Sequence, residues 1–181
     1  MYYIKLSMLP PIEKIRYIRK LEKFLSDLVY EYPSHNEWYN KMIISMYTNF
    51  DRDIILAVEK CDIIGVAILK KTDIEKKICT LRVDEKYQNL GIGSMLVKKS
   101  IEILETERPI ITVSSDKCGE FRKLFNYFGF NIETVYYNKY RNNTAEIVYN
   151  GILLPESLLI TNENTFEGNN RNNRMFSSVI I

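Results

Sequence analysis

The sequence is poor in the residues that most often mark nucleophilic or metal chemistry. Its 181 residues contain one histidine and three cysteines. The single His35 leaves Ser-His or Cys-His catalysis only if it is itself the base, and its polar surroundings favour a solvated surface position. Cys61, Cys79 and Cys118 have neither metal-ligand nor redox spacing, so we expect reduced thiols and no metal.

Strong charge and long apolar runs are also lacking. The formal net charge is +2, which gives no dominant attraction to nucleic acid. The first residues lack the pattern of a signal peptide, and no window approaches the length of a spanning helix. We therefore expect a cytoplasmic protein without a membrane role. What is present, 46% hydrophobic and 27% charged residues, is ordinary globular composition.

Helical and β-type periodicities follow one another along the chain. In order, we expect a strand over 2–9, a helix over 12–32, a second helix capped by Ser34, strands over 53–58, 63–69 and 77–83, a helix over 93–104, a strand over 109–113, a helix over 121–128, and a hairpin of strands over 131–137 and 144–149. This order, β-αα-βββ-α-β-α-ββ, predicts an α/β fold with a mixed sheet rather than alternating βαβ units.

The texture of the sequence changes after Gly151. We expect residues 1–151 to form one domain and 152–181 to form a C-terminal extension. Residues 162–174 are rich in asparagine and poor in apolar side chains, which is typical of a flexible tail. The apolar ending, Val179 to Ile181, is suited to dock on a sheet edge.

One strand-to-helix junction, Gln88 to Ser94, has the features of an anion site. Backbone N–H groups at the start of a helix have no intrahelical partner, and the helix dipole adds partial positive charge there. Such a site binds phosphates through the main chain. Gly91 and Gly93 keep side chains from holding the phosphates away. The third glycine of a dinucleotide-binding motif and the Gly-Lys-Ser/Thr ending of a P-loop are absent.

Two motifs carry a resemblance to a known family. Gln88-x-x-Gly91-x-Gly93 resembles the Gln/Arg-x-x-Gly-x-Gly/Ala signature of the Gcn5-related N-acetyltransferase (GNAT) family. The aromatic segment Leu124 to Phe130, which ends in Gly-Phe, resembles the family's second landmark. The resemblance covers residues 2–150. It implies a mostly antiparallel sheet with a splayed parallel pair, here 77–83 and 109–113, and acetyl-CoA as cosubstrate.

The resemblance also implies which residues hold the cosubstrate. Its pantetheine arm would lie between the splayed strands, paired with the main chain of Val83, while the N–H group of Leu81 would polarise the thioester carbonyl. The pyrophosphate would be held by the main chain of Gln88, Asn89, Leu90, Gly91, Ile92, Gly93 and Ser94. Cys118 stands where the family often has an asparagine that contacts the arm. A covalent acyl-cysteine step is one reading of Cys118, and a small helix-entry residue is the other.

The implied reaction is direct attack of a primary amine on the thioester, which needs a base and a proton donor. Many members have a tyrosine where this chain has Phe125. Tyr127 is then a candidate donor, besides a tyrosine of the last hairpin (Tyr136, Tyr137 or Tyr140) or unaided departure of the thiolate. Glu75 is a candidate base because Lys77 occupies the position of a glutamate found in some members, on the same strand face. The alternative for Glu75 is a solvated charge.

Acceptor specificity is expected in the N-terminal helices and the last hairpin. Trp38, Ser114 and Arg141 are candidate acceptor contacts, although Trp38 also suits the core and Arg141 a solvated turn. The acceptor would be a small molecule, a peptide or a protein. Two alternatives remain, toxin-like acetylation of aminoacyl-tRNA and a non-catalytic acyl-CoA-binding module. An exposed edge strand in the hairpin would also allow a homodimer.

Overall fold

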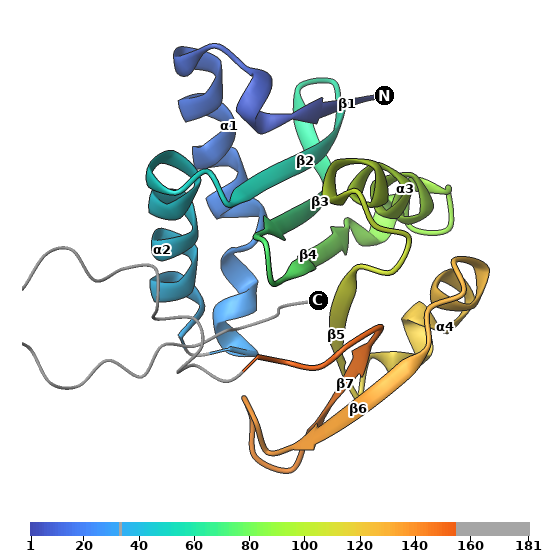
Figure 1. Cartoon of the computed structure of the whole chain (residues 1–181). Helices are drawn as coiled ribbons and strands as arrows, with labels where there is room; N and C mark the ends of the chain where they lie inside the picture. The colour runs from blue at the N-terminus through green and yellow to red at the C-terminus, as the bar shows by residue number, and fades with distance from the viewer. Residues whose placement is uncertain (33, 155–181) are drawn as a thin grey trace, which may run out of the picture.

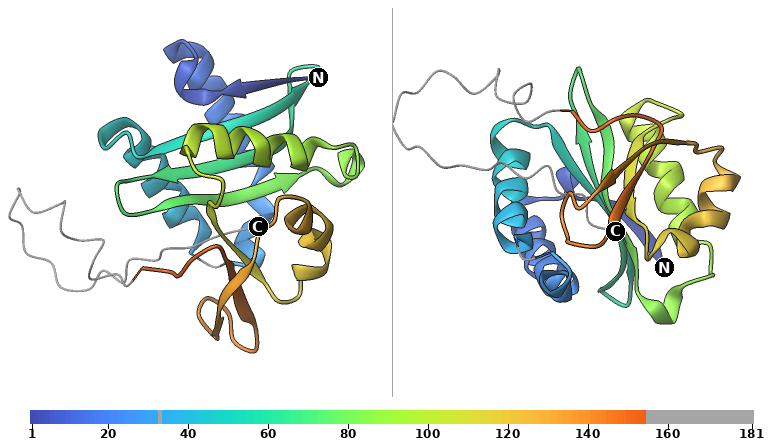
Figure 2. Two further views of the ribbon diagram at one scale, coloured as in Figure 1. Left: turned by 45° about the vertical axis from the view of Figure 1, so that its right-hand side comes forward. Right: turned by 90° about the horizontal axis from the view of Figure 1, so that it is seen from below.

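A seven-stranded sheet with helices on both faces forms the protein. The computed structural model describes residues 1–32 and 34–154. The strand order is β1-β2-β3-β4-β5-β7-β6, and all neighbouring strands are antiparallel except β4 and β5. Helices α1 and α2 cover one face, and α3 and α4 cover the other (Figure 1; Figure 2, right). The predicted mixed α/β fold with one parallel pair is confirmed.

The elements follow the predicted order. They are β1 (Tyr2–Lys5), the 3-10 helix η1 (Leu6–Met8), α1 (Pro11–Phe24), the 3-10 helix η2 (Ser26–Tyr30), α2 (His35–Thr48), β2 (Arg52–Glu59), β3 (Asp62–Lys71), β4 (Lys76–Val83), the 3-10 helix η3 (Glu85–Tyr87), α3 (Ile92–Leu104), β5 (Ile110–Ser114), α4 (Cys118–Tyr127), β6 (Ile132–Tyr137) and β7 (Ala145–Tyr149).

The largest differences from prediction lie near the N-terminus. The first strand ends at Lys5 instead of residue 9. The first helix ends at Phe24, and η2 follows because a tighter 3-10 winding buries both Leu25 and Leu28, which are three residues apart. Ser34 is the N-cap residue of α2, as predicted, but its side chain makes no capping hydrogen bond.

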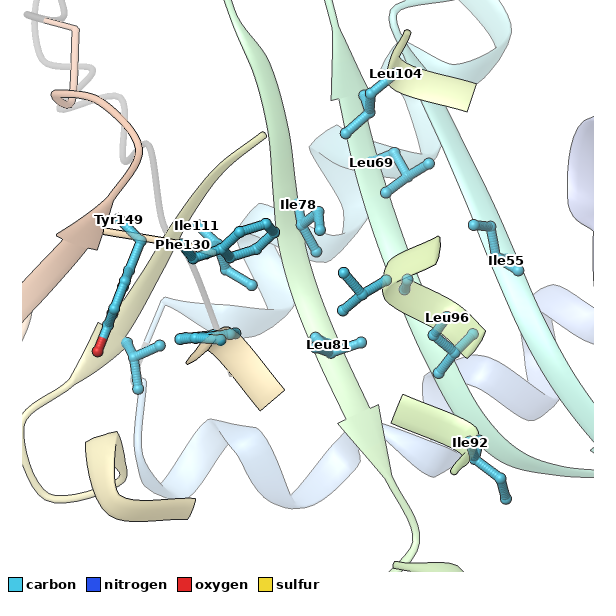
Figure 3. Packing of buried hydrophobic residues seen from close by; sticks show 14 of the residues in the cluster. Ile55, Leu69, Ile78, Leu81, Ile92, Leu96, Leu104, Ile111, Phe130 and Tyr149 are labelled. Carbon is cyan, nitrogen blue, oxygen red and sulfur yellow. The ribbon is translucent and has the colours of Figure 1, made fainter. Parts of the chain in front are cut away.

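The two faces of the sheet bury separate hydrophobic clusters. On the α3 and α4 side, Leu81 of β4 packs near Ile92 and Leu96 of α3 (Figure 3). Gly65 of β3 allows this close approach, since a Cβ atom there would lie 3.1 Å from Cγ2 of Ile92 and 3.2 Å from Cδ1 of Leu96. The first turn of α3 is thereby fixed against the sheet.

No helix within 1–32 and 34–154 has the length and apolar character needed to cross a membrane. The predicted C-terminal extension lies outside the described residues from 155 onwards. The asparagine-rich segment 162–174 and the apolar ending 179–181 therefore stay predictions.

Candidate active site

The parallel strands β4 and β5 pair only at one end. Lys77 lies opposite Ile110, and Ile78 lies opposite Ile111, but no further pair follows. On their outer sides both strands stay paired, β4 with β3 as far as Val83 and β5 with β7 as far as Ser114. The chain therefore opens a splay between β4 and β5, with main-chain groups on either side that no strand satisfies.

The direction of the main chain identifies which residues of β4 face this splay. Asp84, just past β4, donates its N–H group to the carbonyl oxygen of Ile64 in β3, at 2.9 Å. Successive residues of a strand turn their N–H and C=O groups to opposite sides. Val83 and Leu81 therefore turn theirs away from β3, toward the splay. This is the orientation that the predicted contacts of Leu81 and Val83 require.

The first turn of α3 lies at the open end of β4. Gly91 precedes the helix with φ +80, and the first intrahelical hydrogen bond runs from the N–H group of Met95 to the carbonyl oxygen of Gly91, at 3.0 Å. Among the described residues, the N–H groups of Ile92, Gly93 and Ser94 have no acceptor. Three donors at the positive end of a thirteen-residue helix form an anion site.

The glycines of this turn are not explained by packing within the chain. A Cβ atom on Gly93 would make only ordinary contacts, 3.7 Å from Cδ2 of Leu124 and 3.9 Å from Cγ2 of Val83. A Cβ atom on Gly91 would meet nothing within 4 Å, although its positive φ favours glycine. Space kept clear beside unpartnered N–H groups is what a bound phosphate needs, so the residues present fit the pyrophosphate of a coenzyme.

The face of the splay toward α4 is aromatic. Phe125 is buried and stacks between Phe121 and Phe130, with ring centroids 5.4 and 5.5 Å away, and it meets Tyr149 edge-on. Tyr149 of β7 is labelled beside Ile111 in Figure 3. Its hydroxyl lies 3.3 Å from Sγ of Cys118, at the start of α4.

Tyr127 is not brought to this face. Its side chain is 78% exposed, and its ring meets only Phe128 edge-on among the described aromatic rings. Two residues along a helix correspond to a large rotation about its axis, so a helix that buries Phe125 turns Tyr127 outward. Of the two predicted catalytic residues at α4, Cys118 lies at the site and Tyr127 does not.

The opposite face of the splay, toward α1 and α2, is polar. Its members, which we call the polar face, are Thr80 of β4, Thr112 and Ser114 of β5, and Glu146 of β7. Ser114 lies directly opposite Glu146 in the β5–β7 ladder. All four side chains are buried. Among the described residues, neither the hydroxyls of Thr80 and Thr112 nor the carboxylate oxygens of Glu146 have a hydrogen-bond partner, whereas the Ser114 hydroxyl lies within reach of Tyr32 and Asp116.

Glu146 is the titratable group of the polar face. Burial raises its pKa to about 7 against the opposing effect of Arg141, with Asp116 raising it further and Lys77 lowering it. Tyr32, between η2 and α2, lies close enough that the Glu146 carboxylate adds to the effect of burial, which raises the pKa of Tyr32 to about 12. A buried carboxyl with a pKa near neutrality suits proton transfer.

Glu75 is buried as well, so the alternative of a solvated charge is wrong. Its carboxylate lies 2.6 Å from Nζ of Lys70 and 3.9 Å from Nζ of Lys77. Burial acts to raise the pKa of Glu75, but the two ammonium groups outweigh it and hold the pKa below its usual value. It also lies just before Lys77, at the paired end of β4 and β5 rather than at the splay.

The three predicted acceptor contacts occupy different positions. Ser114 belongs to the polar face. Arg141, in the β6–β7 turn, forms an ion pair with Asp116 at 3.0 Å and lies over the ring of Tyr32, 5.3 Å from its centroid. Trp38 packs in the core between α2 and the sheet.

His35 corrects another expectation, because it is 3% exposed rather than solvated. Its ring lies 5.8 Å from that of Trp38, and burial lowers its pKa. The helix α2 turns it toward the sheet together with Trp38.

Glu146 was missed at the sequence level, although a signal was present. It is a lone charge in the otherwise apolar run Ala145–Tyr149. Strand alternation places Ile147 and Tyr149 on the aromatic face and Glu146 on the other. What the sequence does not show is that β7 lies beside β5, which brings Glu146 to the splay.

Comparison with known proteins agrees with this geometry. The model of the acetyltransferase (GNAT) family matches residues 13–125, more than half of the chain. The chain therefore belongs to the acetyltransferase (GNAT) family. Membership implies an acyl-CoA-dependent acyltransferase. No curated protein sequence matches the chain.

Solved structures show the same fold at low sequence identity. A protein from Desulfovibrio desulfuricans described as an acetyltransferase of the GNAT family has a TM-score of 0.66 at 15% identity, over 82% of this chain and 96% of that one. The aminoglycoside 6'-N-acetyltransferase from Enterococcus faecium has a TM-score of 0.58 at 16% identity, over 86% and 100%. An aminoglycoside 6'-N-acetyltransferase complexed with coenzyme A has a TM-score of 0.60 at 16% identity, over 86% and 100%. At these identities the likeness concerns the fold alone.

Proposed function

We propose that this chain transfers the acetyl group of acetyl-CoA to a primary amine by direct attack in a ternary complex. The observation that carries this function is the row of unpartnered N–H groups at the start of α3, placed at the open end of the β4–β5 splay. One feature binds an anion, and the other accepts an extended chain between two strands. Together they match a cosubstrate with a pyrophosphate and a linear arm.

The binding roles follow from the positions of the main chain. The N–H groups of Ile92 to Ser94 would hold the pyrophosphate, and the exposed backbone from Gln88 to Gly91 would complete the cradle. The main chain of Val83 would pair with the arm as an added strand does. The N–H group of Leu81 would then face the thioester carbonyl, where a donor stabilises the charge that develops during attack.

Phe125 has no acidic proton, so it cannot protonate the departing thiolate of the coenzyme. Cys118 and the hydroxyl of Tyr149 are the polar groups of the aromatic face. We assign Cys118 a place in the lining of the arm rather than a covalent step, because direct attack of the amine needs no acyl-enzyme intermediate. Thiolates of ordinary pKa are tolerable leaving groups near neutral pH.

Acetylation of a panel of primary amines tests this function. Purified chain is mixed with acetyl-CoA and, separately, with spermidine, tyramine and the amide of Nα-acetyl-lysine, and products are read by mass spectrometry. We expect an acetylated product from at least one amine and none from the matching alcohols. Tight binding of acetyl-CoA without turnover of any amine would contradict the enzyme and favour a binding module.

A further inference from the structure

The polar face lacks hydrogen-bond donors and a positive charge, both of which a bound ammonium group would supply. The hydroxyls of Thr80 and Thr112 and both carboxylate oxygens of Glu146 are buried and have no hydrogen-bond partner within the described part of the chain. Buried polar groups are normally satisfied, so such a concentration at one place marks a site. A carboxylate only accepts hydrogen bonds, and an alkylammonium offers three donors and the opposite charge.

The polar face also lies next to the position of the reacting carbonyl. Thr80 immediately precedes Leu81, whose N–H group faces the splay, and Ser114 ends β5 on the other side of it. Glu146 lies beside Ser114 in the next strand. An acceptor bound here would meet the thioester from the α1 and α2 side, while the coenzyme sulfur would face α4.

We propose that Glu146 binds the ammonium group of the acceptor on the polar face and takes its proton, so that Glu146 is the general base of the reaction. This inference rests on the proposed function and adds the residue and the face from which the acceptor reacts. One N–H proton of the ammonium passes to a carboxylate oxygen of Glu146 and then to water. The freed lone pair forms the C–N bond, the C–S bond breaks, and a second N–H proton ends on the coenzyme sulfur.

Other elements set the charge around Glu146. Arg141, Asp116 and Lys77 act on its charge directly, and Tyr32 and Tyr140 lie close enough to be affected by it. Further out are Glu31, which pairs with Lys117 and acts on Tyr32, and Glu75, which acts on Tyr140. Most of these charges are paired. Arg141 is held by Asp116, Lys117 by Glu31 at 2.5 Å, and Glu75 by Lys70.

Two of these ion pairs, Arg141–Asp116 and Lys117–Glu31, lie where an acceptor would enter. Asp116 and Glu31 are partly exposed, with 54% and 33% of their side chains accessible. The two pairs link the loops that carry Glu31, Asp116 and Arg141, and Glu146 itself is buried.

The decisive variant is Glu146→Gln, which keeps the shape and removes the base. Glu133→Gln is the matched control, because Glu133 lies in the same hairpin and pairs with Arg108 at the surface. With the best amine of the panel, we expect kcat of wild type to rise through about pH 7 and then level off. Glu146→Gln should lower kcat at pH 8 by about 100-fold, abolish that rise and leave KM for acetyl-CoA unchanged. The control should stay within about twofold of wild type.

Failure of this inference and failure of the proposed function give different results. If wild type acetylates an amine and Glu146→Gln retains both its kcat and its pH profile, Glu146 is not the base. If folded wild type acetylates no amine, the proposed function is wrong, and the binding measurement below decides whether Glu146 holds an ammonium group.

A second measurement needs no turnover. In 13C spectra of wild type labelled at glutamate carboxyls, the Glu146 signal is the one lost in Glu146→Gln. Ethylammonium should shift this signal, while tetramethylammonium, which has no N–H donor, should not. Equal responses to both ions, or none to ethylammonium, would overturn the ammonium site.

Discussion

The ring of Phe125 meets the ring of Tyr149 edge-on, with the two centroids 4.7 Å apart. This contact joins α4 to β7 across the end of β5 and closes the aromatic face of the splay. Phe125 thus replaces the tyrosine common in the family with a side chain that packs. We therefore expect the role of Phe125 to be structural.

Truncation of this ring tests that role. We expect Phe125→Ala to lower the free energy of unfolding by about 3–5 kcal/mol, because it leaves a cavity among aromatic rings. Chemical denaturation measures the change. Phe121→Ala is a useful comparison, since Phe121 is only half-buried and should lose less. An equal, small loss in both variants would show that Phe125 does not anchor α4.

Removal of the Tyr127 hydroxyl should leave turnover unchanged. The side chain is 78% exposed and faces away from the splay, so it cannot reach the coenzyme sulfur without turning the helix. We expect kcat of Tyr127→Phe to stay within about twofold of wild type, whereas loss of a true proton donor costs on the order of 100-fold. Tyr30→Phe, at a similarly exposed tyrosine far from Tyr127 along the chain, is the control. A large fall in kcat for Tyr127→Phe alone would restore Tyr127 as the donor.

Glu75 should matter for stability because it neutralises buried lysines. Lys77 is 2% exposed, and Glu75→Gln would leave it without its carboxylate. We expect Glu75→Gln to lower the free energy of unfolding by about 3 kcal/mol at pH 7. The folded-state pKa of Glu75 is depressed, so this contribution is present above the unfolded pKa and is lost as pH falls through the folded pKa. Denaturation curves at pH 7 and pH 4 that show the same difference would contradict this.

Glu146, unlike Glu75, should lower the stability of the folded protein when it is ionised. Its folded-state pKa is raised from 4.5 to about 7, so the protonated form is favoured and its stabilising effect is lost as pH rises from 4.5 through 7. We expect Glu146→Gln to raise the free energy of unfolding at pH 8 by roughly 1–3 kcal/mol, with a smaller difference at pH 5. Denaturation at both pH values measures this. Destabilisation of equal size at the two pH values would mean that Glu146 is not a buried charge.

The sequence was sufficient for the parts of the molecule that depend on local pattern. The order of strands and helices, the glycine turn before α3 and the aromatic end of α4 follow from periodicity and from residues such as Gly91 and Gly129. Burial set by distant contacts was not visible. His35 was expected at the surface because its neighbours are polar, but α2 turns it onto the core beside Trp38.

The candidate site shows the same division. The proposed coenzyme-binding residues, Gln88 to Ser94, form one continuous segment and could be predicted together. Glu146 becomes notable only because β7 lies between β5 and β6, which places it opposite Ser114. Glu75 was considered for its place in the sequence, but its ion pairs with Lys70 and Lys77 depend on side-chain burial that no spacing shows.

Calorimetric titration of acetyl-CoA into wild type, Gly93→Glu and Gly119→Glu shows whether the start of α3 binds the coenzyme. Gly93 and Gly119 are each the second residue of their helices, α3 and α4, and neither position blocks a Cβ atom. A carboxylate near a helix N-terminus favours the helix, so both variants should fold. We predict that wild type and Gly119→Glu bind acetyl-CoA with similar affinity, while Gly93→Glu, with its charge among the phosphate-binding N–H groups, loses binding. Undiminished binding to folded Gly93→Glu, or no binding to wild type, would contradict the account.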